Sequence, residues 1–216
     1  ENISVLGQFS FNQFIMWNDM RNRSEELMNH KVVASLISGK MEWEQQGEFQ
    51  SPDTLDNTVL PNDMAVPISA DSSQLSAIYA SGNGLSFVLH GPPGTGKSQT
   101  ITNIIANALF QGKTVLFIAE KMAALSVVQR RLESIGLGPF SLELHSNKTK
   151  KRDALSQLDE VLSIPKAMHP DDYAARAQKL FELRKELNSV ISAIHSKRPI
   201  GLSLYDIITM YESTSS

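Results

Sequence analysis

Cysteine is absent from this 216-residue sequence, which excludes disulfide bonds and metal sites with thiolate ligands. No apolar run approaches the roughly 20 residues that a transmembrane helix requires. The first residues contain no basic stretch followed by an apolar one, so no secretory signal is visible. We therefore expect a cytoplasmic protein that has no membrane partner.

A strong excess of positive charge is also missing, since the net charge is −3. Residues 1–70 hold ten acidic and four basic side chains, and a small excess of basic residues follows. This balance argues against a protein that coats DNA, but it leaves room for a local polyanion site in the second half. Apolar residues make up 41% of the chain, enough to exclude a wholly disordered protein.

The middle of the chain predicts alternating strands and helices. Short apolar runs at 85–90, 114–119 and 140–144 are typical of buried strands, and amphipathic stretches between them predict helices. The helices are expected at about 72–82, 98–111 and 122–134. Strands and helices at this interval favour an α/β fold with a partial parallel sheet and flanking crossover helices.

The two ends of the chain have a different organisation. Residues 1–63 read as a lead-in segment with a possible strand at Val5–Phe11, a helix at Asp19–Ile37 and a polar linker or long loop at 38–63. Residues 64–150 form the predicted α/β subdomain. Residues 151–216 predict only helices, at 152–163, about 171–196 and 202–211.

A complete phosphate-loop motif lies between the first predicted strand and its helix. Gly91-Pro92-Pro93-Gly94-Thr95-Gly96-Lys97-Ser98 matches G-x-x-x-x-G-K-[ST]. Glycines allow positive φ and let backbone N–H groups converge on a phosphate. Lys97 is expected to reach the β- and γ-phosphates, and the Ser98 hydroxyl to bind Mg²⁺. The alternative is a tight strand-to-helix turn that binds no nucleotide.

Gln74 lies seventeen residues before this motif, at the start of its own predicted helix. A glutamine amide presents a donor and an acceptor side by side, and the N6 and N7 edge of adenine complements them. Such a pair would favour ATP over GTP by roughly ten- to a hundredfold, from about 1–3 kcal/mol. The alternative is a solvated glutamine at a helix start.

These motifs together resemble the first motor domain of superfamily 1 helicases. The resemblance is carried by Asp-Ser-Ser-Gln74-x-x-Ala-Ile, GPPGTGKSQTI and TVLFIAEKMAAL, and it is specific over residues 66–152. The branch that they resemble most contains the RNA- and DNA-translocating helicases related to the nonsense-mediated-decay motor. More narrowly, the segments resemble large bacterial helicase-like proteins.

The resemblance implies a P-loop NTPase (RecA-like) fold with a C-terminal all-helical, stalk-like insertion. It implies that ATP and Mg²⁺ bind at Gln74, Gly91, Pro93, Gly94, Thr95, Gly96, Lys97, Ser98 and Gln99, with Lys97 and Ser98 in the catalytic set. It places Glu120 and Lys121 in motif Ia, against a nucleic-acid strand, and His145 and Ser146 in motif Ib.

Ser146 to Arg152 packs four cations into seven residues. We interpret Lys148, Lys150 and Lys151 as contacts to the phosphate backbone of single-stranded DNA or RNA. The alternative is a solvated helix start. The five histidines show no metal spacing, so we expect no zinc site.

Parts of the resembled motor are missing from this sequence. No later stretch supplies motif II, an Asp-Glu pair at the end of a strand, and no second RecA-like motor domain with its arginine finger follows. The resemblance therefore implies a fragment of a larger translocase that binds ATP but has negligible ATPase activity in isolation. Two further hypotheses stay open: a signalling or chaperone-type P-loop ATPase, and a protein-interaction module built from residues 1–60 and 152–216.

Overall fold

The computed structural model describes residues 4, 7, 11–41, 47–92, 94–144, 151–165 and 172–214, with the side chains of 11–13 and 151–154 left out. The chain divides into two compact units, Glu1–Gln46 and Gly47–Ser216. The division predicted from the sequence, at residues 63 and 150, stays a prediction.

The first unit contains three helices, α1 (Phe11–Asn22), α2 (Ser24–Asn29) and α3 (Lys31–Ser38). The single helix predicted over 19–37 is thus interrupted, because Arg23 and His30 leave helical geometry. Most of the strand predicted at Val5–Phe11 lies outside the described residues, and Phe11 itself begins α1.

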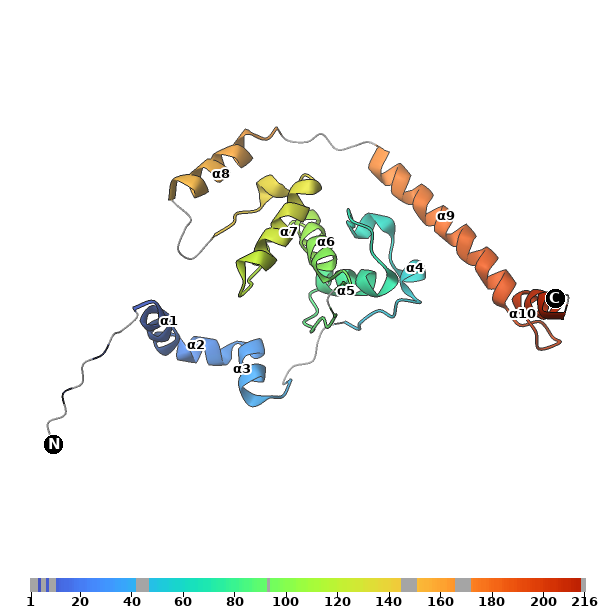
Figure 1. Cartoon of the computed structure of the whole chain (residues 1–216), viewed down its shortest axis with the longest axis horizontal. Helices are drawn as coiled ribbons and strands as arrows, with labels where there is room; N and C mark the ends of the chain where they lie inside the picture. Colours follow the sequence, from blue (N-terminus) through green and yellow to red (C-terminus); the bar gives the residue numbers. More distant parts are fainter. Residues whose placement is uncertain are drawn as a thin grey trace. The chain divides into compact units, whose positions relative to one another are not determined.

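The second unit is built from helices of very different length (Figure 1). In chain order they are α4 (Leu55–Thr58), η1 (Pro61–Asp63), α5 (Ser72–Gly82), α6 (Lys97–Phe110), α7 (Met122–Ser134), η2 (Gly138–Phe140), α8 (Lys151–Ser163), α9 (Asp172–His195) and α10 (Leu204–Thr214). The predicted helices at 72–82, 98–111, 122–134, 152–163, 171–196 and 202–211 are therefore confirmed to within a few residues. None of the helices in the described part of the chain is long and apolar enough to span a bilayer.

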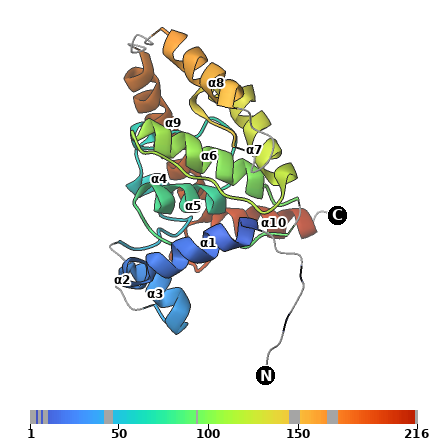
Figure 2. The same cartoon turned by 90° about the vertical axis from the view of Figure 1, so that its left-hand side faces the viewer.

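The packed centre of this unit is formed by α5, α6 and α7, which lie side by side in both views (Figures 1 and 2). Ile105 of α6 and Val128 and Leu132 of α7 form a buried cluster, and partly buried neighbours such as Phe117 pack against it. On the other side of α6, Ile78 of α5 is fully buried. Helix α6 is therefore covered on two faces.

The predicted parallel sheet is wrong for the part of the chain that the structure describes, which is helical and contains no β-strand. Residues 85–90, 114–119 and 141–144 have no regular secondary structure. Several of their apolar side chains are exposed, Val88 by 80% and Leu116 by 84%. The physical reason is that an apolar, β-branched run favours extended backbone, whereas a strand also needs hydrogen bonds to a distant segment.

The polar stretch 38–63, predicted as a linker or long loop, contains the short helices α4 and η1. Leu55 and Val59 are buried here. Asp56 of α4 pairs with Arg184 of α9 at 3.3 Å and accepts a hydrogen bond from Asn188 at 3.0 Å. An ion pair and a hydrogen bond, both made by Asp56, thus attach this stretch to the long helix.

Candidate nucleotide-binding site

The first helix of the site, α5, begins at a complete capping box. The Asp71 carboxylate accepts hydrogen bonds from the Gln74 backbone N–H at 2.8 Å and from the Ser73 hydroxyl at 2.6 Å. In return, Gln74 Oε1 accepts from the Asp71 backbone N–H at 3.2 Å. The Ser73 hydroxyl and the Gln74 N–H lower the pKa of Asp71, because both stabilise its ionised form. From the sequence, either Asp71 or Ser72 could cap this helix, and the structure shows Asp71 as the cap.

The phosphate loop leads directly into α6. Gly94 and Gly96 have φ values of 91° and 78°, in the left-handed region that favours glycine, and Gly96 is the N-cap residue of α6. The first backbone N–H groups of a helix have no partner within the helix, and the helix dipole favours an anion at this end. The start of α6 is therefore a position that favours an anion such as phosphate.

Side chains inside the loop hold it in a compact turn. The Thr95 hydroxyl donates to Pro92 O at 2.8 Å, and the Lys97 ammonium donates to Gly91 O. A Cβ atom at Gly91 would lie only 2.5 Å from Thr95 Oγ1, so a side chain at this position would displace the turn. An ammonium has three donors, so the bond from Lys97 to Gly91 leaves capacity for a phosphate oxygen.

Gln74 connects α5 to the phosphate loop. Its Nε2 donates to Thr95 O at 3.1 Å, and a Cβ atom at Gly96 would lie 2.5 Å from the same nitrogen. A primary amide has two N–H donors and two acceptor lone pairs. The bonds to Thr95 and Asp71 use one donor and one lone pair, so one of each remains, the set that the adenine edge complements.

A cavity of about 560 Å³ adjoins the loop, within the range of small-ligand sites. Its polar and charged lining includes groups from α5, the loop and the start of α6. The lining residues are Phe49, Pro52, Asp71, Ser73, Gln74, Ser76, Ala77, Val88, Leu89, His90, Gly91, Pro92, Thr95, Lys97 and Thr100.

The cavity brings together four of the predicted nucleotide-binding residues, Gln74, Gly91, Thr95 and Lys97. The remaining described ones, Gly94, Gly96, Ser98 and Gln99, belong to the same loop and first helical turn but do not line it. Pro93 lies outside the described residues.

The predicted nucleic-acid contacts are not part of this cavity. Glu120 and Lys121 are exposed, directly before α7. Lys151 is the first residue of α8, but its side chain is among those left out. His145, Ser146, Lys148 and Lys150 lie outside the described residues.

Among the described residues of the site, the Ser98 hydroxyl is the predicted ligand for a metal ion. The described part of the chain contains no cluster of three or more His, Asp or Glu side chains that could hold a metal. The one Asp-Glu pair of the sequence, Asp159-Glu160, lies within α8. The Ser98 hydroxyl alone is too small a ligand set for Mg²⁺, which requires octahedral oxygen coordination, so phosphate oxygens and water would have to complete it.

Phe49 and His90 also line the cavity, although neither was predicted from the sequence as a site residue. Phe49 packs edge-on against Phe87, with ring centroids 6.0 Å apart. Phe49 lies in the stretch 38–63 that was predicted as a linker or long loop. An apolar aromatic residue within this polar run was the sequence feature that could have indicated a packing contact. His90 directly precedes the first glycine of the motif, so its position beside the loop was predictable from the sequence.

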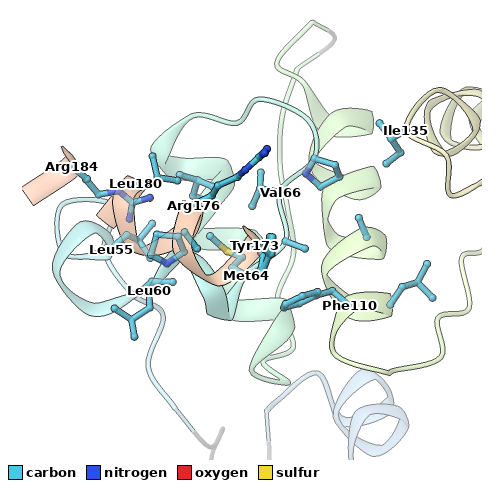
Figure 3. Close-up of a pocket in the computed structure, with 18 of the residues that line it drawn as sticks. Leu55, Leu60, Met64, Val66, Phe110, Ile135, Tyr173, Arg176, Leu180 and Arg184 are labelled. Carbon is cyan, nitrogen blue, oxygen red and sulfur yellow. The ribbon is translucent and has the colours of Figure 1, made fainter. Parts of the chain in front are cut away.

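A larger cavity of about 900 Å³ is lined mainly by apolar side chains of α4, η1, α6 and α9, among them Leu55, Met64, Phe110 and Leu180 (Figure 3). Its cations have acidic partners: Arg184 pairs with Asp56, and Arg176 with Asp172 at 3.5 Å. None of the predicted site residues lines this cavity. A highly charged nucleotide therefore fits the smaller, polar cavity better.

Comparison with known families defines the class of protein to which this site belongs. Residues 69–199, more than half of the chain, match the profile of a family described as an AAA domain. The chain belongs to this family. The matched range begins just before the Asp71 cap and includes Gln74, the phosphate loop and α6.

Two curated proteins that are similar to segments of this chain are named as ATP-dependent helicases. A segment of 47 residues is 55% identical to an uncharacterized ATP-dependent helicase of Mycoplasma genitalium, and covers 22% of this chain but 4% of that protein. A 64-residue segment is 55% identical to its Mycoplasma pneumoniae homolog, and covers 29% of this chain and 6% of that protein. No solved structure matches. The resemblance to a helicase motor is therefore confirmed, over a small part of the length of these relatives.

Proposed function

We propose that the chain is the ATP-binding part of a superfamily 1 helicase motor, with ATP bound in the 560 Å³ cavity beside the phosphate loop. The observation that carries the proposal is the contact between Gln74 Nε2 and Thr95 O at 3.1 Å. It brings the residue expected to select the base to the loop expected to hold the phosphates, although the two are 21 positions apart.

Each end of the nucleotide has a suitable group in this arrangement. The Lys97 ammonium and the N-terminal amides of α6 would attract the β- and γ-phosphates. The remaining donor and acceptor of Gln74 would pair with adenine N7 and N6. Phe49 supplies an apolar ring on the cavity wall. Mg²⁺, when bound with ATP, supplies positive charge at the phosphates, and Ser98 is the residue of this chain that would contribute to holding it.

The nucleic-acid partner is proposed from the sequence and from the names of the relatives. Lys148, Lys150 and Lys151 would neutralise phosphates of single-stranded DNA or RNA, with Glu120, Lys121, His145 and Ser146 along the same strand. We propose a second motor domain elsewhere in the longer protein as the partner that closes on ATP. ATP turnover by the present chain alone should be negligible, since its sequence lacks motif II and the arginine finger, and its described residues contain no cluster of three or more His, Asp or Glu side chains that could hold a metal.

The test is ATP binding by calorimetry with Mg²⁺ present, comparing wild type with Lys97→Ala. Loss of a charge-assisted contact worth about 1.5–3 kcal/mol should weaken binding by at least about tenfold. Lys113→Ala is the matched control, because Lys113 follows the opposite end of α6 and also donates to a glycine carbonyl, that of Gly82. It should bind like wild type. Unchanged affinity in Lys97→Ala would show that the site is misassigned.

A further inference from the structure

A row of amide side chains lies along one face of α6. Gln99, Asn103 and Asn107 are spaced by four residues, which places them one above the other on the helix. All three bond to backbone groups of one segment, residues 65–69. The buried face of a helix is normally apolar, so a row of amide side chains there is unusual and indicates a specific role for its hydrogen bonds.

Asn103 makes the most complete of these contacts. Its Oδ1 accepts from the Ile68 N–H at 3.1 Å, and its Nδ2 donates to Ile68 O at 2.8 Å, so one amide satisfies both backbone groups of one residue. The side chain is fully buried, with 0% of its surface exposed. A two-bond contact between buried polar groups fixes position and register, because any slip leaves groups unsatisfied.

The other two members support the same segment at its ends. Asn107 Oδ1 accepts from the Ala65 N–H at 3.0 Å, and Gln99 Nε2 donates to Ser69 O. Asn107 is also buried, with 1% exposed. The segment 65–69 is thus held at three points along α6.

This segment leads, after one residue, into Asp71, the cap of the helix that carries Gln74. Gln74 in turn bonds to Thr95, which directly precedes the N-cap residue of α6. A continuous series of contacts therefore links the middle of α6 to its start. Helix α6 holds the segment 65–69, this segment leads to the capping box and Gln74, and Gln74 bonds to the phosphate loop before α6.

We propose that Asn103 is a positioning residue for base selection. It fixes the segment 65–69 on the phosphate-loop helix, and this sets where the Gln74 amide stands relative to the bound triphosphate. The inference rests on the proposed function, since it concerns how the ATP site distinguishes adenine from guanine. Asn103 acts through Gln74 and does not contact the nucleotide.

The test compares Asn103→Asp with the matched change Asn107→Asp, one turn away and equally buried. Aspartate at 103, in its ionised form, keeps an acceptor for the Ile68 N–H but has no donor for Ile68 O. At 107 it keeps the acceptor that the Ala65 N–H uses. The measurement is the ratio of the GTP to the ATP dissociation constant, expected at roughly 10 to 100 in wild type. We expect Asn103→Asp to lower this ratio at least about threefold, and Asn107→Asp to change it less than twofold.

A double-mutant cycle with Gln74→Ala separates positioning from a merely structural role. With Gln74 removed, Asn103→Asp should leave the remaining ratio unchanged. The inference is overturned if Asn103→Asp weakens ATP and GTP equally, if it lowers the ratio further without Gln74, or if wild type shows no preference for ATP. Absence of any nucleotide binding by wild type would instead overturn the proposed function, and this inference with it.

If Asn103→Asp does not fold, amide hydrogen exchange of the wild-type chain decides the question. Because adenine contacts would stiffen Gln74 and the segment behind it, ATP should slow exchange of the Ile68 N–H more than GTP does, by at least about threefold. Equal slowing by saturating ATP and GTP overturns the inference.

Discussion

At the scale of single residues, the site depends on Asp71 and Gln74 at the start of α5, where the side chain of each accepts a hydrogen bond from the backbone N–H of the other. The sequence predicted Asp71 or Ser72 as the helix cap and Gln74 as an adenine contact. Capping is local, since donor and acceptor are three residues apart, so its motif is visible in the sequence. The bond from Gln74 to Thr95 is not local and could not be read there.

Asp71→Ala should destabilise the chain by about 1 kcal/mol, because it leaves N-terminal donors of α5 without their acceptor. The measurement is urea unfolding at neutral pH. The matched control is the exposed Asp53→Ala, expected to change stability by less than about 0.5 kcal/mol.

The effect of Asp71 should also depend on pH. Its folded-state pKa is lowered by the Ser73 hydroxyl and the Gln74 N–H, so the stabilisation is present above the ordinary pKa of aspartate. It is lost as the pH falls through the lower, folded-state value. The difference between wild type and Asp71→Ala should therefore shrink in acid, and a difference that grows on acidification would contradict the capping role.

At the scale of elements, α6 combines two kinds of packing. One face carries the amide row that holds residues 65–69, and another buries Ile105 against Val128 and Leu132 of α7. The position of this helix was predictable, because its hydrogen bonds lie within its own segment and Gly96 and Gly112 bound it. The partners of the buried asparagines were not predictable.

Ile105→Ala should lower the free energy of unfolding by about 2–5 kcal/mol, because it opens a cavity in the α6–α7 cluster. Chemical denaturation followed by circular dichroism measures this. The control is Leu162→Ala in α8, where the side chain is 84% exposed and the change should stay within about 0.5 kcal/mol. Equal effects of the two substitutions would mean that the cluster is not the stabilising core.

At the scale of the whole molecule, charge is distributed unevenly along the chain. The acidic excess is confined to the first 70 residues, and the predicted nucleic-acid contacts lie in the second half. The AAA domain match of residues 69–199 includes both the phosphate loop and the basic stretch from Ser146 to Arg152. Substitutions of the predicted nucleic-acid contacts should therefore weaken binding of a DNA or RNA strand without changing ATP binding.

Replacing Lys148, Lys150 and Lys151 by glutamine should weaken binding of a labelled single-stranded oligonucleotide, measured by fluorescence anisotropy. The slope of log affinity against log salt should become smaller by roughly two, since each phosphate contact on a single strand contributes about 0.7. Neutralising the exposed Lys179, Lys185 and Lys197 of the α9 region is the charge-matched control. If both triple variants lose affinity alike, binding reflects net charge only.

The sequence by itself determined what depends on near neighbours: the helices of the second unit, the α5 cap and the glycine geometry of the phosphate loop. Helical and capping bonds form within a few residues, so periodicity and end signals suffice to predict them. Only the tertiary structure decided that the apolar runs at 85–90, 114–119 and 141–144 form no β-strand, and that Gln74 contacts Thr95. Both outcomes depend on which distant segments come together, and the order of residues in one segment does not contain that information.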